Sequence, residues 1–500
     1  VRGVKKMSTN FNSSRVEIRE KRLKTVLTFQ GKASELAEKG HEGKLKIGKF
    51  CYGQCGDCQE GCAKGLVYGI RDAAVVSHAP IGCFATIAGN YQECQGIADN
   101  RNKGKFDHHA ICTNIQEKDT IYGAGEKLRT AIRQAKKRYN PKVIFVSSSC
   151  ASGIIGDDIQ GIASEMQEEV GVPVVSLACE GFKSKIWSTG WDAGFNAILR
   201  AVVKAPEKKD EDIVNIFNFA GTDRFTRLLG LIDLKPHYLP YVTTTEELSH
   251  ISEAAASATI CETLASYVAE GLEELYGVPQ VKAAAPYGIR ATDKWLRAVA
   301  ELTGREDRVE AAIEAEHERI KERYEQLKEQ LRGKKVYVFA GDSYAHNVIS
   351  MARDFEMDVV GTTTYHHDGK SDSEEINTLK FMVENVGDVE NYNVCNKQPY
   401  QVLKFLKNLQ PELLIVRHPA LAALGYKSGV PTIFDADSNL GVGYDGEIEF
   451  GERILRAFKT HKLVDNIAAH TTFPYTDWWM NQDTDAFYFV NDGKKKEVNA

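Results

Sequence analysis

Hydrophobic positions along the chain gather in short runs, several of which are followed by small residues and then by a helical pattern. Four runs are clear: Val143–Val146 before SSSC, Ile213–Phe219 before AGTD, Val336–Phe339 before AGDS and Leu413–Val416 before RHPA. A buried strand, a small-residue turn and a helix, repeated in this order, form βαβ units on parallel sheets. The pattern therefore predicts an α/β fold in which ligands bind at the carboxyl ends of the strands.

Two charged stretches suggest where domains meet. The chain has 500 residues, and about 150 residues per domain suggests about three domains. Lys204–Asp212 is a charged, proline-containing break before a fresh strand, and Arg305–Lys335 is typical of a long charged amphipathic helix. We therefore predict domains at 1–205, 206–332 and 333–500.

Composition excludes several classes of function. Hydrophobic residues make up 43% and charged residues 26%, the balance of a soluble globular protein. The net charge is −6 and basic residues are scattered, so no nucleic-acid or membrane partner is expected. No window offers the ~18 uncharged apolar residues of a membrane helix, and no apolar run follows the basic start, so no secretory signal is expected. The chain has no GxxxxGK[ST] loop, which assigns any ATP-driven step to another polypeptide.

The cysteines are unevenly placed. There are 11, and four of them, Cys51, Cys55, Cys58 and Cys62, form a C-x3-C-x2-C-x3-C cluster. Disulfide frameworks belong in short secreted chains, so this pattern favours metal or cluster ligation in a reducing compartment, the cytoplasm. Thiolates are the natural ligands of iron–sulfur clusters, and a zinc site is the alternative.

Two more cysteines lie in short turns. Cys83 is the last residue of the turn SHAPIGC. Cys150 is the fourth residue of SSSCASGIIGDDI and lies just past a predicted strand. Backbone N–H groups in such a turn could stabilise a cluster sulfide. Alone, a single cysteine is more often a small buried hydrophobe.

These segments resemble the component-1 proteins of the nitrogenase superfamily. In that family one cysteine precedes K-G-x-V-[WY]-G, a second ends H-G-P-x-G-C and a third opens C-x-x-x-[IV]-I-G-D-D. Here Cys58 precedes Lys64–Gly69 (KGLVYG), Cys83 ends its turn, and Cys150 precedes Ile155–Asp158 (IGDD). The likeness covers most of the chain, is strongest over 50–200, and includes QEKD at Gln116–Asp119 and CEGF at Cys179–Phe182. It implies three Rossmann-like parallel-sheet domains of the component-1 type.

The resemblance also implies a ligand set. Cys58, Cys83 and Cys150 would hold half of a P-type [8Fe-7S] cluster in the first domain, and a β-type homologous subunit would supply the other half. Cys62 remains an alternative to Cys58, and Cys51 and Cys55 are surplus to the family pattern.

A second cluster is implied by Ser257–Pro279, a predicted helix that ends in YGVP. It resembles the family segment whose thiolate anchors the active-site cofactor, so Cys261, in the middle domain, would bind a larger nitrogenase-type iron–sulfur cofactor. A helix cysteine taken alone is more often a packing residue. Whether that cofactor is iron-only or contains a heterometal, and whether homocitrate is present, stays open.

The chain departs from dinitrogen-reducing subunits around this cofactor. Where they place a glutamine and a histidine after CEGF, this chain has Trp187 and Trp191, and an indole cannot act as a histidine does in proton transfer. No histidine follows the turn at Gly429–Pro431 in the expected register. His366 and His367 could compensate, or could be solvated loop residues.

These features together predict a catalytic α subunit that reductively cleaves the C–S bond of small methylthio-alkanes and releases methanethiol. Trp187 and Trp191 would form an aromatic wall for a thioether, and His366, His367 and Tyr365 are the candidate proton donors. The expected partners are a β-type subunit in an α2β2 complex and an ATP-dependent [4Fe-4S] reductase. The alternative function is a cofactor-assembly scaffold without substrate turnover; a tetrapyrrole reductase and a dinitrogenase fit the sequence less well.

Overall fold

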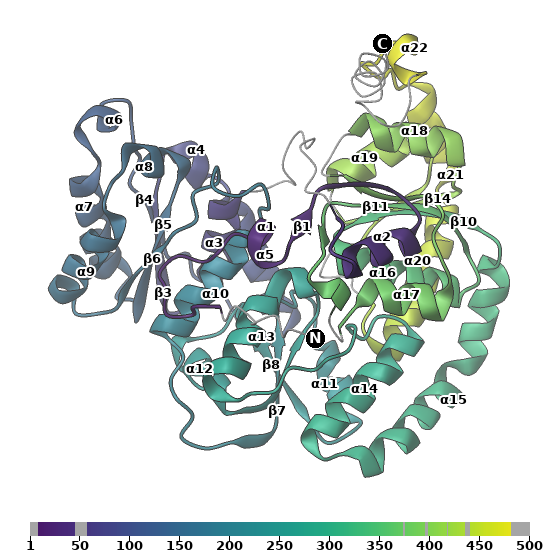
Figure 1. The fold of residues 1–500 in the computed structure, drawn as a ribbon, viewed down its shortest axis with the longest axis horizontal. Coiled ribbons are helices and arrows are strands. Elements are labelled where there is room, and N and C mark those ends of the chain that lie inside the picture. Colours follow the sequence, from purple (N-terminus) through teal and green to yellow (C-terminus); the bar gives the residue numbers. More distant parts are fainter. Residues whose placement is uncertain are drawn as a thin grey trace. The chain divides into compact units, whose positions relative to one another are not determined.

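The computed structural model describes residues 9–45, 58–373, 376–395, 399–417, 419–435 and 441–481 (Figure 1). Cys51 and Cys55 lie outside these residues. The described chain forms two compact units: the first holds 9–25, 58–286 and 290–315, and the second holds 26–45, 287–289 and the residues from 316 onward. The division at 205 and 332 into three domains stays a prediction.

The first unit contains a four-stranded parallel sheet in the order β4-β3-β5-β6 (Figure 1). Its strands are β3 (Ala73–His78), β4 (Ala110–Cys112), β5 (Val143–Ser148) and β6 (Val174–Leu177). Helices that belong to this part of the chain are α3 (Gln59–Tyr68), α4 (Ile81–Phe84), α5 (Ile87–Asn100), α6 (Asp119–Tyr122), α7 (Gly125–Tyr139), α8 (Cys150–Ile155), α9 (Ile159–Val170) and α10 (Thr189–Ala201).

Both faces of this sheet are buried, which explains the unbroken apolar runs in the sequence. Val75 and Phe145 belong to one core with residues of α3, α5 and α10, whereas Val76 and Ile144 belong to a second core with residues of α7 and α9. The carboxyl ends of β3 and β5 lie side by side because the two strands pair in register up to His78 and Ser148.

The first unit also contains a three-stranded parallel sheet in the order β8-β7-β9. Its elements are β7 (Asp210–Phe217), α11 (Arg224–Gly230), β8 (Lys235–Leu239), α12 (Thr245–Ser249), β9 (Ala254–Thr259) and α13 (Glu262–Tyr276). The predicted strand at 213–219 is confirmed with an earlier start.

The second unit is built on a six-stranded sheet in the order β15-β14-β10-β11-β13-β2. The first five strands are parallel to their neighbours, and β2 from the N-terminal segment runs antiparallel to β13. The elements are β2 (Thr28–Gly31), α2 (Ala33–His41), β10 (Lys335–Ala340), α16 (Asp342–Asp354), β11 (Asp358–Thr364), α17 (Thr378–Val386), β13 (Tyr392–Cys395), α18 (Pro399–Leu409), β14 (Leu413–Val416), α19 (Pro419–Lys427), β15 (Thr432–Phe434), α20 (Gly443–Phe458), α21 (His461–Ala469) and α22 (Asp477–Met480).

The predicted parallel-sheet α/β class is confirmed by these sheets. The predicted long charged helix is α15 (Glu306–Leu331), preceded by α14 (Ile289–Thr303). Within the described residues, no helix has both the length and the apolar character that a membrane crossing requires.

Candidate metal-cluster site

Three of the predicted ligands lie in or directly before helices of the part of the chain that forms the four-stranded sheet. Cys58 is the N-cap residue of α3, Cys83 lies in α4 just after β3, and Cys150 is the first residue of α8 just after β5. The register of β3 with β5 places the turns after these two strands at the same edge of the sheet. Chain topology therefore brings together residues that are far apart in sequence.

Gly181 shows how closely two of these thiols approach. A Cβ atom placed on Gly181 would lie 3.2 Å from the Cys150 Sγ and 3.7 Å from the Cys58 Sγ, so both sulfurs border one small volume. Cys83 follows β3, whose register with β5 brings the two following turns to the same sheet edge. Burial raises the pKa of its thiol, and the charges of Glu60, Cys58 and Cys150 raise it further, whereas Lys64 lowers it. Cys83 and Cys150 are exposed and Cys58 is half-buried.

Cys62 lies one turn further along α3 and is only 4% exposed. A Cβ atom on Gly190 in α10 would lie 2.9 Å from the Cys62 Cβ, so Cys62 packs against α10. The cysteine that meets Cys150 beside Gly181 is Cys58. The choice of Cys58 over Cys62 as a ligand stays a prediction, and this packing favours it.

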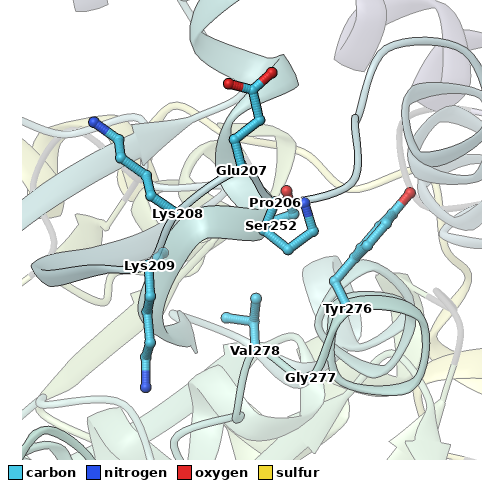
Figure 2. A pocket seen from close by; sticks show the side chains of 9 residues that line it. Pro206, Glu207, Lys208, Lys209, Ser252, Tyr276, Gly277 and Val278 are labelled. Atoms are coloured by element: carbon cyan, nitrogen blue, oxygen red, sulfur yellow. The ribbon is translucent and has the colours of Figure 1, made fainter.

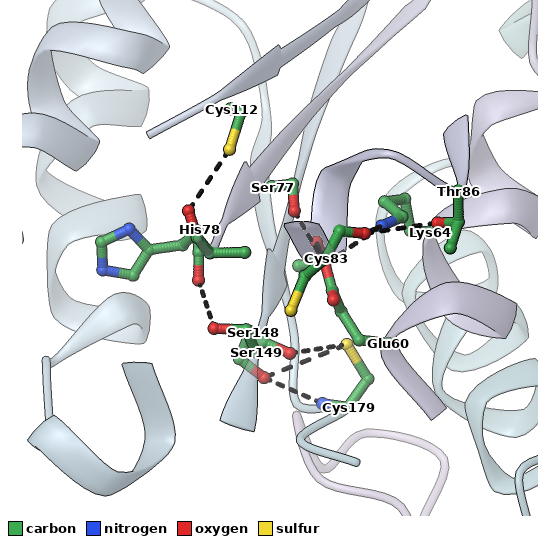
Figure 3. Close-up of polar contacts among 12 residues, drawn as sticks. Glu60, Lys64, Ser77, His78, Cys83, Thr86, Cys112, Ser148, Ser149 and Cys179 are labelled. Carbon is green, nitrogen blue, oxygen red and sulfur yellow. Dashed lines mark hydrogen bonds and ion pairs between the residues drawn. The ribbon is translucent and has the colours of Figure 1, made fainter. Parts of the chain in front are cut away.

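A buried ion pair holds the backbone of Cys83 (Figure 3). The Lys64 Nζ donates a 2.7 Å hydrogen bond to the carbonyl oxygen of Cys83 and lies 3.4 Å from the Glu60 Oε1. The same Glu60 oxygen accepts hydrogen bonds from the hydroxyls of Ser77, at 2.7 Å, and Ser147, at 3.1 Å. Buried charges are tolerated only when they are paired and hydrogen-bonded in this way. Neither Glu60 nor Lys64 stands out as a site residue in the sequence.

The start of α8 is fixed by a capping box. The Ser149 Oγ accepts a hydrogen bond from the Ser152 N–H at 3.2 Å and donates one of 2.8 Å to the carbonyl oxygen of His78 (Figure 3). The His78 ring in turn lies 2.9 Å from an Asp157 carboxylate oxygen. Burial lowers the pKa of His78, although Asp157 opposes this shift. These contacts hold Cys150 at the end of β5.

Cys179 has a different role, although it opens the CEGF segment. It is fully buried, and its single S–H lies within hydrogen-bonding distance of the carbonyl oxygens of Ser148 and Leu177, at 3.4 and 3.3 Å (Figure 3). Burial holds the pKa of this thiol well above its usual value. Cys179 is therefore a structural residue whose buried thiol is held in the protonated form.

The chemistry of the grouped donors fits an iron–sulfur cluster. Thiolates are the ligands that such clusters require, and the N-terminus of α3 favours negative charge at Cys58. Within the part of the chain described above, no three His, Cys, Asp or Glu side chains are arranged to hold a single metal ion.

Residues 58–459 match the family described as nitrogenase component 1 type oxidoreductase. The chain belongs to this family. Membership implies iron–sulfur clusters as cofactors. The predicted family is thereby confirmed, whereas its methylthio-alkane reductase branch stays a prediction.

Several proteins of this family are similar to the chain over much of its length. The nitrogenase iron-molybdenum cofactor biosynthesis protein NifE of Methanococcus maripaludis is 28% identical over 81% of this chain and 83% of its own. The nitrogenase molybdenum-iron protein alpha chain of Clostridium pasteurianum is 29% identical over 69% of this chain and 67% of its own. A solved structure, nitrogenase Cp1 at pH 5, shares the fold with a TM-score of 0.69 at 22% identity, covering 89% of this chain and 100% of that one.

Cys261, the predicted cofactor ligand, lies directly after β9 as the N-cap residue of α13. It is 8% exposed. Its position at the carboxyl end of a parallel strand agrees with where ligands bind in this class of sheet. Its role as a ligand stays a prediction.

Trp187 and Trp191 do not share a helical face. Because α10 begins at Thr189, Trp187 lies in the turn before the helix and only Trp191 is helical. Trp191 packs against the core of the first unit and contacts Tyr241 edge to face, with ring centroids 6.4 Å apart. The predicted substrate wall therefore cannot rest on their four-residue spacing.

His366 and His367 lie in the second unit and are 2% and 1% exposed, so they are not solvated loop residues. The His367 Nδ1 lies 3.2 Å from an Asp342 oxygen, and its Nε2 lies 2.7 Å from an Asp372 oxygen. Burial lowers the pKa of His367, but the charges and hydrogen bonds of the two carboxylates outweigh it and hold that pKa well above its usual value. With both ring nitrogens bonded, His367 has no nitrogen left for a metal. Tyr365 is also buried.

The first unit also has a surface pocket of about 370 Å³ away from the cysteines (Figure 2). It lies between the charged break after α10 and the end of α13. Its lining residues are Pro206, Glu207, Lys208, Lys209, Ser252, Ala254, Tyr276, Gly277 and Val278. None of them is a cysteine or a histidine, so this pocket offers no soft metal ligand.

Proposed function

We propose that the chain is the α-type subunit of a nitrogenase-like iron–sulfur reductase. In this proposal Cys58, Cys83 and Cys150 hold half of a P-type [8Fe-7S] cluster that a β-type subunit completes in an α2β2 complex. The observation that supports it most strongly is the approach of the Cys150 and Cys58 sulfurs to one point beside Gly181. When bound, the cluster supplies one-electron transfer between an ATP-dependent [4Fe-4S] reductase and the active site.

The chain's own residues hold this site in shape. The buried Lys64 fixes the carbonyl of Cys83, while Glu60 ties Lys64 to the two strands that carry the turns. The Ser149 cap fixes the start of α8 and with it Cys150. Preorganised ligands limit the rearrangement that electron transfer requires, because the supporting groups are already in place.

For the substrate we propose small methylthio-alkanes. Reductive cleavage of one such thioether takes two electrons and two protons: the C–S bond breaks, a C–H bond forms on the alkyl carbon, and methanethiol leaves. Cys261 would hold the larger iron–sulfur cofactor, which supplies a soft metal surface for a sulfur donor. The support is the replacement of the expected glutamine and histidine by Trp187 and Trp191. His366, His367 and Tyr365 stay candidate proton donors.

A cofactor-assembly scaffold is the second candidate. It is favoured by the relatives: the NifE protein of Methanococcus maripaludis aligns with 81% of this chain, against 69% for the Clostridium pasteurianum alpha chain. A scaffold would use the same cysteines to hold a precursor cluster and would pass it to an acceptor.

One experiment separates the two functions. The chain is purified anaerobically with its β-type subunit, analysed for metals, and supplied with the reductase, ATP and a small thioether. The reductase proposal expects methanethiol in the headspace, and none from the Cys150→Ala complex. A fully metallated and reduced complex that releases no methanethiol, but passes its cofactor to an apo-acceptor, would establish the scaffold instead.

A further inference from the structure

Gln59 at the start of α3 holds the loop that carries Gly181. The side-chain amide of Gln59, the residue after Cys58, donates to the carbonyl oxygens of Glu180 and Ser184 at 3.3 and 3.4 Å. Gln59 is 3% exposed, so these bonds are shielded from water. They fix the loop on both sides of Gly181, where an added Cβ would meet two predicted cluster ligands.

Glu20 in the N-terminal segment also binds this loop. Glu20 lies in the short helix α1 (Arg19–Arg22), and its two carboxylate oxygens accept separate hydrogen bonds. One comes from the Ser184 hydroxyl at 2.7 Å, and the other from the Lys185 backbone N–H at 2.6 Å. One carboxylate thus bonds two consecutive loop residues, in the short geometry typical of charged acceptors.

A buried ion pair anchors α1 itself to α10. The Arg19 guanidinium donates to both carboxylate oxygens of Asp192, at 3.0 and 2.6 Å, and Arg22 donates to the same carboxylate at 2.9 Å. The side chains of Arg19 and Asp192 are 0% and 1% exposed. Lifting α1 away would leave Asp192 buried without its partners, which is strongly unfavourable. The helix is therefore a fixed support and not a loosely attached extension.

We propose that α1 is a strap over the cluster site and that Glu20 is a positioning residue for it. Glu20 holds the loop around Gly181 against Cys58 and Cys150, and so fixes the wall on one side of the cluster. The proposal rests on the proposed function only in so far as these cysteines hold a cluster. It assigns a role to an N-terminal segment that the cysteine pattern does not include.

The test compares Glu20→Ala with Glu20→Gln and with Glu17→Ala, which removes an exposed carboxylate three residues earlier, in the anaerobically purified complex. Two rates are measured: hydrogen exchange in a peptide covering 180–186, and iron release to a ferrous chelator. Loss of two bonds to a charged acceptor should raise exchange about tenfold in Glu20→Ala, and iron release should rise several-fold. Glu20→Gln keeps one amide oxygen as acceptor and should fall between, whereas Glu17→Ala should match the parent.

Either of two results would contradict the proposal that Glu20 positions the loop beside the cluster. Unchanged exchange in Glu20→Ala would show that Glu20 does not hold the loop. Faster exchange with unchanged iron release would show that the loop does not position the cluster. A failure of the proposed function looks different: Cys58→Ala and Cys150→Ala would keep full iron, whatever Glu20 does. The urea midpoint of each variant separates a local change from general destabilisation, since a strap acting only on the loop leaves that midpoint unchanged.

Discussion

Gly181 is a position where any side chain would meet two predicted ligands. The added methyl of Gly181→Ala would lie 3.2 Å from the Cys150 Sγ and 3.3 Å from the Cys58 Cβ, so at least one cysteine must shift. We expect a folded protein that has lost about half or more of its interface-cluster iron, because a displaced ligand is a poor one. Iron analysis and the absorption spectrum of the complex measure this. Gly96→Ala, where nothing lies within 4 Å of the new Cβ, is the control and should keep its iron.

Substitution of a predicted ligand cysteine should remove cluster iron, whereas substitution of a buried cysteine should not. Replacing Cys83 or Cys150 by Ala should remove the interface cluster and cut electron transfer, while the site at Cys261 can still fill. Cys94→Ala is the matched control: Cys94 is 1% exposed within the core, so its loss should lower stability by about 1 kcal/mol and leave the iron content unchanged. Metal analysis and electron paramagnetic resonance report both outcomes. Full iron and full activity in Cys150→Ala would contradict the ligand assignment.

Individual residues also show the limit of prediction from sequence. Cys58, Cys83 and Cys150 could be singled out because their flanking motifs are distinctive. Glu60 and Lys64 could not, because charged residues on a helix are normally exposed. Here they are 2% and 0% exposed, because they pair with each other and Glu60 accepts hydrogen bonds from serines of two strands. A single sequence does not reveal such long-range pairing.

Among the helices, α10 shows how tertiary contacts set an element's start. The spacing of Trp187 and Trp191 suggested one helical face, yet α10 begins at Thr189. The turn before it is held by Gln59 and Glu20, and its first residues are tied to α1 through Asp192. These partners lie more than 120 residues away in sequence, so local pattern could not locate the helix start.

Trp191→Phe tests whether this helix contributes to the substrate site. The Trp191 Nε1 is buried and has no hydrogen-bond partner in the described structure, so the substitution removes no hydrogen bond. Phenylalanine keeps most of the contact with Tyr241, and the free energy of unfolding should fall by less than about 1.5 kcal/mol. If Trp191 lines the site, methanethiol release per cluster should fall or change in selectivity. Reduced stability with unchanged turnover would mark Trp191 as a packing residue only.

The carboxyl edge of the six-stranded sheet should respond to acid through His346. Its ring lies 2.8 Å from the Thr378 hydroxyl and 2.7 Å from the Tyr392 hydroxyl, and burial lowers its pKa to about 4. The unfolded chain, with an ordinary pKa of 6.5, therefore binds one more proton between these values, and stability falls as the pH drops through them. His367, whose pKa is raised, gives stability that is fully present below 6.5 and is lost only as the pH rises through its folded pKa.

His346→Gln isolates this effect, because glutamine can bond both hydroxyls but does not titrate. On going from pH 7 to pH 5 the parent should lose on the order of 2 kcal/mol more than the variant. Hydrogen exchange in peptides of β10 and β11, corrected for intrinsic rates, gives the two stabilities. His367 is present in both proteins, so its contribution cancels in the comparison. Equal losses in parent and variant would show that His346 is not the acid-sensitive group.

On the scale of the whole molecule, the class of fold could be predicted from the sequence, but the order of the strands in the sheets could not. The run at Leu413–Val416 is β14 itself, and the other three runs lie within or overlap β5, β7 and β10. The order of strands was beyond reach: β2 comes from the N-terminal segment yet pairs antiparallel with β13. Such pairing depends on contacts between distant segments, which hydrophobic pattern does not record.

Exposed apolar side chains lie close in sequence to the predicted ligand thiols, where the proposed β-type subunit would pack. Ile81, Ile154 and Phe182 are 60%, 77% and 55% exposed, and each lies within four residues of Cys83, Cys150 or Gly181. Exposed apolar side chains grouped in this way are typical of an interface. The proposed eight-iron cluster needs more than three thiolates, so the proposal requires a second chain to share it. We therefore expect the chain alone to be deficient in cluster iron, and the chain with its β-type subunit to elute as one fully metallated complex in anaerobic size-exclusion chromatography.

Ile154→Lys tests this surface directly. It puts a charge where the partner would pack, so the complex should dissociate and lose its cluster iron, while the isolated chain keeps its stability because Ile154 is already exposed. Leu463→Lys is the matched control, since Leu463 is 61% exposed but lies in the second unit, far along the chain from the cysteines. It should leave assembly and iron unchanged. A stable, fully metallated monomer of the parent chain would contradict the shared cluster, because it would show that the ligands of one chain are sufficient.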